Sequence, residues 1–423
     1  MSRVLAIELR RSAAIGSALT LAVVGVLALY FAEGIGFTDG WMQLAMSQRL
    51  FLALLWPLAL AAGAWQGRRE HRWKVTELFA STPRPVAQRN LPTLAVMAAA
   101  VTCAYLVMGA AGGAWIIGTA EYLPAQVFVV TAVGVLALLA AIGVGLAIGR
   151  LLPWLVVAPA LAIAGLGLLL TIPGATRPRG WLALVFSPIY EMNMPDAFAT
   201  VPGRVSASQA IWLAALTATG VLVFLASTWR LRVAALVPVL LGAALAIPVM
   251  PHEKRVVLSA SDPVAKELVC DGAVCLSRVH GGLLPSVLPD ARKALTVLAE
   301  LPDGPTRLHE DTTTYVPDVY PPWDPGVVLL RVDTGQDAQL AEADTIVENA
   351  VAAAFAGPPG CENSPSPEDR LAAAHWLIGT EPSSPEAAAV WSHLEGMPEA
   401  EAQGKVVTLR AAAVKCAPGA SLS

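Results

Sequence analysis

The fold of this chain is decided by residues 127–149, which read VFVVTAVGVLALLAAIGVGLAIG and contain no charged side chain. About 20 consecutive apolar residues are enough for a helix to cross the ~30 Å hydrocarbon core of a bilayer. Six other runs approach this length. Together the seven apolar runs lie near residues 12–32, 48–66, 92–118, 127–149, 151–172, 208–228 and 232–250. The sequence therefore predicts an all-α membrane bundle of about seven transmembrane helices.

The composition of the chain changes at about residue 250. Of the 423 residues, 56% are hydrophobic and 14% are charged, which is far more apolar than a soluble protein of this length. Residues up to Met250 carry sixteen basic and eight acidic side chains, whereas those from Pro251 onward carry twelve and twenty-four. A basic apolar half and an acidic polar half belong to two physical environments. We expect a transmembrane domain over 1–250 and a soluble acidic domain over 251–423.

The region 251–423 has the mixed pattern of a small α/β or α+β domain. Strands are predicted at 255–258 and 327–332, and helices at 288–300, 338–356, 367–379, 384–395 and 399–415. Proline-rich turns separate these segments. The sequence therefore predicts that a small soluble α/β or α+β domain follows the membrane bundle.

Arginine and lysine in short loops indicate the orientation, because cytoplasmic loops carry an excess of both. With the N-terminus inside, the cytoplasmic side holds twelve of them: Arg3, Arg10, Arg11, Arg68, Arg69, Arg72, Lys74, Arg84, Arg89, Arg150, Arg230 and Arg232. The outer side then holds four: Arg49, Arg177, Arg179 and Arg204. An odd number of spans places 251–423 outside the cytoplasm. Because the composition is typical of a GC-rich bacterial genome, we expect a multi-pass protein of a bacterial plasma membrane.

The cysteines provide an independent indication of the compartment. Cys103 lies in the third span, while Cys270, Cys275, Cys361 and Cys416 all lie in the polar domain. An even set on the outer face is compatible with disulfides in an oxidising compartment. We favour Cys270 with Cys275 and Cys361 with Cys416, although four cysteines allow three pairings. Free thiols and a zinc site are alternatives, but zinc needs closely spaced ligand pairs and only the first pair is close.

The cytoplasmic loop 66–91, between the second and third spans, has a periodic pattern. Trp73, Leu78 and Phe79 recur at helical spacing with charges between them, and Pro83 ends the pattern. This pattern predicts a short amphipathic helix at the membrane surface. A simpler interpretation is a basic loop that only obeys the positive-inside rule.

The same loop fits the pattern R-E-x-x-x-x-x-x-E-L-x-x-x-T-P at three dipeptides: Arg69-Glu70, Glu77-Leu78 and Thr82-Pro83. In this feature the chain resembles the coupling-helix region of ABC transporter permeases of the ABC-2 class. The resemblance covers roughly residues 1–230, with a short basic N-terminal segment, six spans and a long outer loop before the sixth. Residues 74–76 replace the glycine that the family usually has before the glutamate, and the seventh span and outer domain are additional.

The resemblance implies the permease subunit of an ATP-driven exporter. Such a subunit pairs with a second permease copy, identical or not, and with a cytoplasmic ABC ATPase that binds the ATP. The chain itself would then not be an enzyme and would need no cofactor. The residues expected to bind the ATPase are Arg69, Glu70, Arg72, Lys74 and Glu77. In agreement, the chain has no G-x-x-x-x-G-K-[ST] phosphate loop, because Gly404-Lys405 is followed by Val406.

The outer stretch 173–206 has an apolar section, 181–190, that could form a re-entrant or interfacial hairpin. Family permeases have short re-entrant helices at this point. Glu191 and Asp196 follow the section and are candidates to line an outer mouth. Ordinary loop carboxylates are the alternative.

The outer domain contains no sequence motif for catalysis or metal binding. His252-Glu253 does not continue into H-E-x-x-H, and no serine has the flanks of a G-x-S-x-G elbow. The cluster 309–311 is His-Glu-Asp, but neither it nor the scattered His280 is part of a spaced ligand set. We therefore predict no catalytic or metal residues and no nucleic-acid partner.

Two other functions compete with the permease. A membrane-anchored receptor or assembly protein would use the spans only to hold the acidic domain outside the cytoplasm. An intramembrane enzyme would need ionisable groups at mid-bilayer depth, and no apolar run has a charge in its middle.

Overall fold

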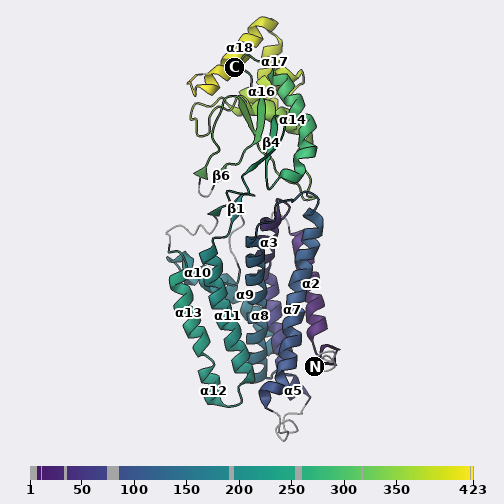
Figure 1. Cartoon of the computed structure of the whole chain (residues 1–423), viewed down its shortest axis with the longest axis vertical. Coiled ribbons are helices and arrows are strands. Elements are labelled where there is room, and N and C mark those ends of the chain that lie inside the picture. The colour runs from purple at the N-terminus through teal and green to yellow at the C-terminus, as the bar shows by residue number, and fades with distance from the viewer. Residues whose placement is uncertain are drawn as a thin grey trace.

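The computed structural model describes residues 7–10, 12–32, 36–73, 85–189, 195–252, 260–315, 318–419 and 421–422. A bundle of long helices and a mixed α/β domain lie one above the other along the long axis of the molecule (Figure 1). The N-terminal segment and α5 (Arg69–Arg72) lie at the end of the bundle away from that domain. This arrangement agrees with an odd number of spans.

Six helical segments within the described residues are long and apolar enough to cross a membrane: α2 (Ala14–Phe31), α7 (Val86–Ile116), α8 (Gln126–Leu151), α9 (Val157–Ala175), α11 (Gly203–Leu225) and α12 with α13 (Trp229–Ala234 and Val237–Val249). A seventh span is possible if α3 (Trp41–Leu50) and α4 (Leu52–Gly67), which meet at a 49° bend, are counted as one. The predicted membrane bundle of about seven helices is thus confirmed. Counted in this way, the second span begins at Trp41 rather than near residue 48. The sequence did not predict its first half because the polar residues of α3 lower the hydropathy there.

Helix α8 lies in the middle of the bundle, packed closely against α4 and α11. A Cβ added to Gly149 would lie 2.2 Å from the Ala64 carbonyl oxygen, and one added to Gly220 would lie 2.5 Å from the Gly143 carbonyl carbon. Only glycine permits such close backbone approach between neighbouring helices. Leucines on the outside of α9 and α13, by contrast, are exposed, as expected for surfaces that face lipid.

A short helix, α10 (Gly180–Phe186), occupies the stretch between α9 and α11. Its residues Ala183, Leu184 and Val185 are buried, and Gln209 of α11 donates a 3.1 Å hydrogen bond to the Leu184 carbonyl oxygen. The apolar section expected here as a re-entrant or interfacial segment is therefore a helix packed against the bundle.

The C-terminal domain is built on a four-stranded sheet in the order β3-β4-β5-β8. Strands β3 (Leu268–Asp271) and β4 (Val274–Ser277) form an antiparallel hairpin, whereas β4, β5 (Arg307–Glu310) and β8 (Val327–Leu330) run parallel. The crossover from β4 to β5 contains η1 (Gly281–Leu283) and α14 (Leu284–Leu298). The other elements are η2 (Ala343–Thr345), α15 (Ile346–Ala353), α16 (Pro367–Ile378), α17 (Pro385–Glu395), α18 (Glu399–Val414) and the pair β6 (Thr314–Tyr315) and β7 (Asp318–Val319). The prediction of a small mixed domain is confirmed.

Both favoured disulfides are present in this domain. Cys270 and Cys275 join β3 to β4 across the hairpin, with their Cα atoms 4.0 Å apart. Cys361 and Cys416 join the loop after α15 to the end of α18, with Cα atoms 5.8 Å apart. Cys103, in α7, is free. Disulfides at these positions favour a location of the domain outside the cytoplasm, because they persist in oxidising compartments.

Candidate functional sites at the two ends of the bundle

Charged side chains from three segments meet at the end of the bundle away from the C-terminal domain. Arg69 of α5 forms an ion pair with Glu8 of the N-terminal segment, and Thr93 of α7 donates a 2.8 Å hydrogen bond to the same carboxylate. Glu70 of α5 pairs with Arg89 of α7, with 3.2 Å between Nε and Oε1. The start of the loop 66–91 is therefore attached to the N-terminal segment and to the third span.

A cavity of about 630 Å³ opens beside these ion pairs. The residues that line it come from the N-terminal segment, the end of α4, α5 with Trp73, and the adjoining ends of α7, α8 and α11. They are Glu8, Gln66, Gly67, Arg69, Glu70, Trp73, Arg89, Asn90, Thr93, Arg150 and Phe224. We call this space the inner cavity. It lies at the end where the sequence predicts the cytoplasm, and charged side chains line it.

The five residues expected to bind an ATPase differ in their contacts and in their exposure to solvent. Arg69 and Glu70 are engaged in the ion pairs described above. Arg72 is exposed, and its guanidinium carbon lies 5.4 Å from the centre of the Trp65 ring. Lys74 and Glu77, together with most of the predicted amphipathic helix, lie outside the described residues. Of the described three, Arg72 is exposed and the paired Arg69 and Glu70 are partly buried, and ATPase binding by all five stays a prediction.

Exposed tryptophans mark the membrane surface at this end. Trp73 and Trp229 are both exposed, and each has an arginine nearby, since Arg72 lies 5.8 Å from the ring centre of Trp73 and Arg230 lies 5.9 Å from that of Trp229. Tryptophan is enriched where a bilayer meets water, and arginine in cytoplasmic loops. The inner cavity therefore lies near the level of the lipid headgroups.

The other end of the bundle is joined to the C-terminal domain by polar contacts. Strand β1 (Ala199–Thr200) pairs with β2 (Ala260–Ser261) in antiparallel fashion. The Tyr122 hydroxyl donates a 2.8 Å hydrogen bond to Asp262, and the Trp115 indole donates one of 2.9 Å to the Gln336 carbonyl oxygen. Thr334 bonds to Asp39. We call this set of contacts the outer junction.

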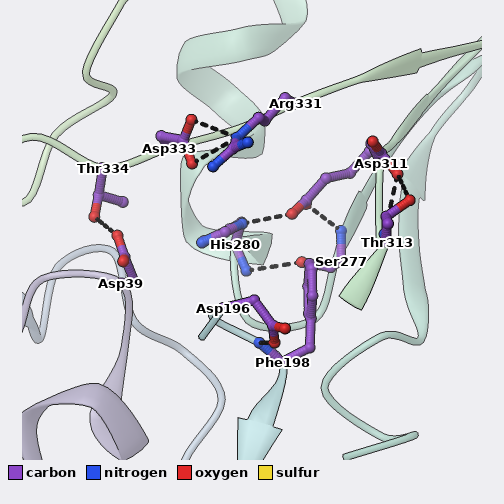
Figure 2. A network of polar contacts seen from close by, with 11 residues as sticks. Asp39, Asp196, Phe198, Ser277, His280, Asp311, Thr313, Arg331, Asp333 and Thr334 are labelled. Atoms are coloured by element: carbon purple, nitrogen blue, oxygen red, sulfur yellow. Dashed lines mark hydrogen bonds and ion pairs between the residues drawn. The ribbon is translucent and has the colours of Figure 1, made fainter. Parts of the chain in front are cut away.

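A buried histidine, His280, lies beside the outer junction (Figure 2), and its partner is the buried carboxylate of Glu310. His280 follows β4 and Glu310 ends β5, so the parallel strands bring them together, with 2.6 Å between His280 Nδ1 and Glu310 Oε1. The Ser277 amide donates a 2.7 Å hydrogen bond to the other oxygen of Glu310. The two residues are only 4% and 2% exposed. Figure 2 shows His280 lying between the domain and the segment that carries Asp39.

Electrostatics favour the protonated form of His280. Burial alone lowers the pKa of His280, but the charge and hydrogen bond of Glu310, with added contributions from Asp39 and Asp333, outweigh it, so the pKa is raised. Its Nε2 atom has no hydrogen-bond partner among the residues that the structure describes. His280 therefore pairs with Glu310 in the interior beside the outer junction, and Asp39 and Asp333, from two other segments, add to the raised pKa.

The stability that His280 contributes should depend on pH. Because its pKa lies above the ordinary value of 6.5, the contribution is fully present below that value and is lost as the pH rises through the raised pKa. We expect the urea midpoint of the domain in the full-length protein to fall as the pH is raised above about 6.5. His280→Gln should flatten this slope, and a variant with the wild-type slope would contradict the assignment.

Asp196, a candidate for an outer mouth, belongs to the turn that leads into β1. Its Oδ1 accepts a 3.0 Å hydrogen bond from the Phe198 amide, and its carbonyl oxygen accepts one of 3.3 Å from Gln43. Burial raises the pKa of this carboxyl group. Glu191 lies outside the described residues. Asp196 thus shapes the turn at the outer junction.

Arg49 is the functional candidate that the sequence pattern missed. The charge count places Arg49 in a loop on the outer side. In the structure it is buried near the bend between α3 and α4. At 1.5 Å per residue it lies about 12 Å along α3 from the start of the helix. Its Nη2 donates hydrogen bonds to Gln209 Oε1 at 3.0 Å and to the Pro188 carbonyl oxygen at 3.4 Å. The assignment is wrong because α3 enters the bundle before the apolar run begins. A cation inside a membrane bundle is usually functional.

The fold and these sites define a multi-pass membrane protein with a disulfide-bonded mixed α/β domain at one end. Comparisons with protein-family models, with curated proteins and with solved structures gave no match.

Proposed function

We propose that this chain is the membrane-spanning permease subunit of an ATP-driven ABC exporter and couples to a separate cytoplasmic ATPase through the loop 66–91. The observation that carries the proposal is the attachment of α5 by two ion pairs, Arg69 with Glu8 and Glu70 with Arg89. A helical segment held in this way passes a displacement to the spans as a rigid body. A merely solvated basic loop would not need these attachments.

Two features of the bundle support the same proposal. The first is the 49° bend between α3 and α4 in the second span. The second is the short helix α10, which lies between α9 and α11 in the chain and packs against α11. Bent spans and short buried helices permit rearrangement without exposing backbone groups to lipid. They accord with the resemblance to ABC-2 permeases, in which short re-entrant helices occur at this place.

The test is co-purification of the full-length tagged chain in mild detergent, followed by identification of the retained proteins. We expect an ATP-binding cassette ATPase in the wild-type complex, in an amount that Arg72→Glu reduces about tenfold, the effect of losing roughly 1.4 kcal/mol of binding. Arg230→Glu is the matched control, because Arg230 is also exposed at this end and also lies beside a tryptophan, but outside the loop.

Two results would count against the permease. One is a wild-type protein that retains no such ATPase, which would favour a membrane-anchored receptor or assembly protein. The other is an equal loss of ATPase in Arg72→Glu and Arg230→Glu, which would show only a general need for positive charge at the inner surface.

A further inference from the structure

Two buried amide donors beside the inner cavity are left unused by the residues that the structure describes. Gln66 and Asn90 line it and are 4% and 6% exposed. Gln66 uses its oxygen to accept a 3.1 Å hydrogen bond from the Ala13 amide. Its Nε2 and the Nδ2 of Asn90 have no partner among the residues that the structure describes. A buried unpaired amide donor costs about 1–3 kcal/mol, so a ligand that accepts from both would recover that energy.

The charge of the inner cavity defines what kind of acceptor fits. Three arginines, Arg69, Arg89 and Arg150, line it together with two glutamates, Glu8 and Glu70. Its lining therefore carries one net positive charge. Guanidinium groups have five donors each. Within the described residues, Arg69 pairs with one Glu8 carboxylate oxygen and Arg150 donates to the Phe224 carbonyl oxygen. A ligand with one negative charge and several acceptor oxygens would balance this lining.

We propose that the inner cavity binds the phosphodiester headgroup of an anionic lipid. A phosphodiester carries a single negative charge, and its oxygens accept hydrogen bonds from arginine and amide donors. Basic pockets between spans on the cytoplasmic side are suited to such headgroups. The exposed Trp73 at the cavity places it near the level of the lipid headgroups. This site does not depend on coupling to an ATPase.

The binding test uses the full-length protein in nanodiscs of phosphatidylcholine with added phosphatidylglycerol, and native mass spectrometry to count retained lipids. We expect wild-type protein to retain phosphatidylglycerol in preference to phosphatidylcholine. Asn90→Leu removes an amide that has no described protein partner and should weaken this retention about tenfold. Arg150→Gln should weaken it as well, whereas Arg230→Gln, at the same surface but outside the cavity, should bind as wild type. Circular dichroism confirms folding of each variant.

A second arm identifies the source of the phosphodiester. Soluble glycerophosphoglycerol is added to protein in pure phosphatidylcholine nanodiscs, and its binding is measured for wild type and Asn90→Leu. Weak binding of the soluble diester with strong retention of the lipid supports the proposal. Equal, Asn90-dependent affinity for both overturns the lipid as the source. Retention of phosphatidylglycerol that neither Asn90→Leu nor Arg150→Gln changes overturns the site itself.

Discussion

Replacing Glu310 with alanine should lower the free energy of unfolding of the C-terminal domain by roughly 3–5 kcal/mol. The carboxylate is buried, pairs with His280 at 2.6 Å and accepts the Ser277 amide at 2.7 Å. Removing it takes away the main cause of the raised His280 pKa, so burial then lowers that pKa, and it leaves the Ser277 amide without its acceptor. His280 also lies 6.2 Å from the ring centre of Phe198, in the segment leading to β1. The loss should therefore also loosen the outer junction.

Urea denaturation of the full-length protein, followed by limited proteolysis of the domain, measures this loss. Asp324→Ala is the control, because Asp324 forms an ion pair of similar distance with Arg307, at 2.8 Å, but both side chains are about half exposed. Its removal should cost less than about 1 kcal/mol. The double variant His280→Leu/Glu310→Leu should recover much of the stability, since apolar pairs replace buried ion pairs well. Equal losses in Glu310→Ala and Asp324→Ala would contradict this account.

The membrane bundle could be predicted because its signal is local. Each of these spans is a continuous apolar run, and hydropathy alone places α8 to within two residues and α7 and α11 to within six. The start of the second span could not be found in this way, because α3 contains Ser47, Gln48 and Arg49 and gains its place by packing and hydrogen bonding inside the bundle. A polar helix that is buried by its neighbours has no hydropathy signal.

The sequence predicted part of the inner candidate site but not the outer one. The positive charge of the loop 66–91 was evident, but its partners were not, because Glu8 lies 61 residues before Arg69. The outer site depends on the parallel pairing of β4 with β5, which brings together His280 and Glu310, 30 residues apart. Short strands with a long crossover leave no periodic signal at that separation.

The disulfide between Cys361 and Cys416 should stabilise the domain more than the one between Cys270 and Cys275. The first closes a loop of 55 residues and the second a loop of 5. A crosslink restricts the unfolded chain more when its loop is longer, which corresponds to about 4 kcal/mol for the first and about 2 kcal/mol for the second. We expect Cys361→Ala/Cys416→Ala to show the larger fall in the free energy of unfolding. Arg410 of α18, which donates hydrogen bonds to the carbonyl oxygens of Ala354, Asp303 and Pro325, should keep the helix attached.

Urea-dependent proteolysis of the two double variants, without reductant, compares these losses directly. Wild-type protein treated with a reductant should lose about as much stability as both pairs together. A larger loss for the hairpin pair would show that Cys270 and Cys275 act through the folded sheet rather than through the unfolded chain. The same measurement bears on orientation, because a domain facing the reducing cytoplasm would contain four free thiols. In that case all four cysteines would react with alkylating reagent before any reductant is added, and the disulfide variants would be as stable as the wild type.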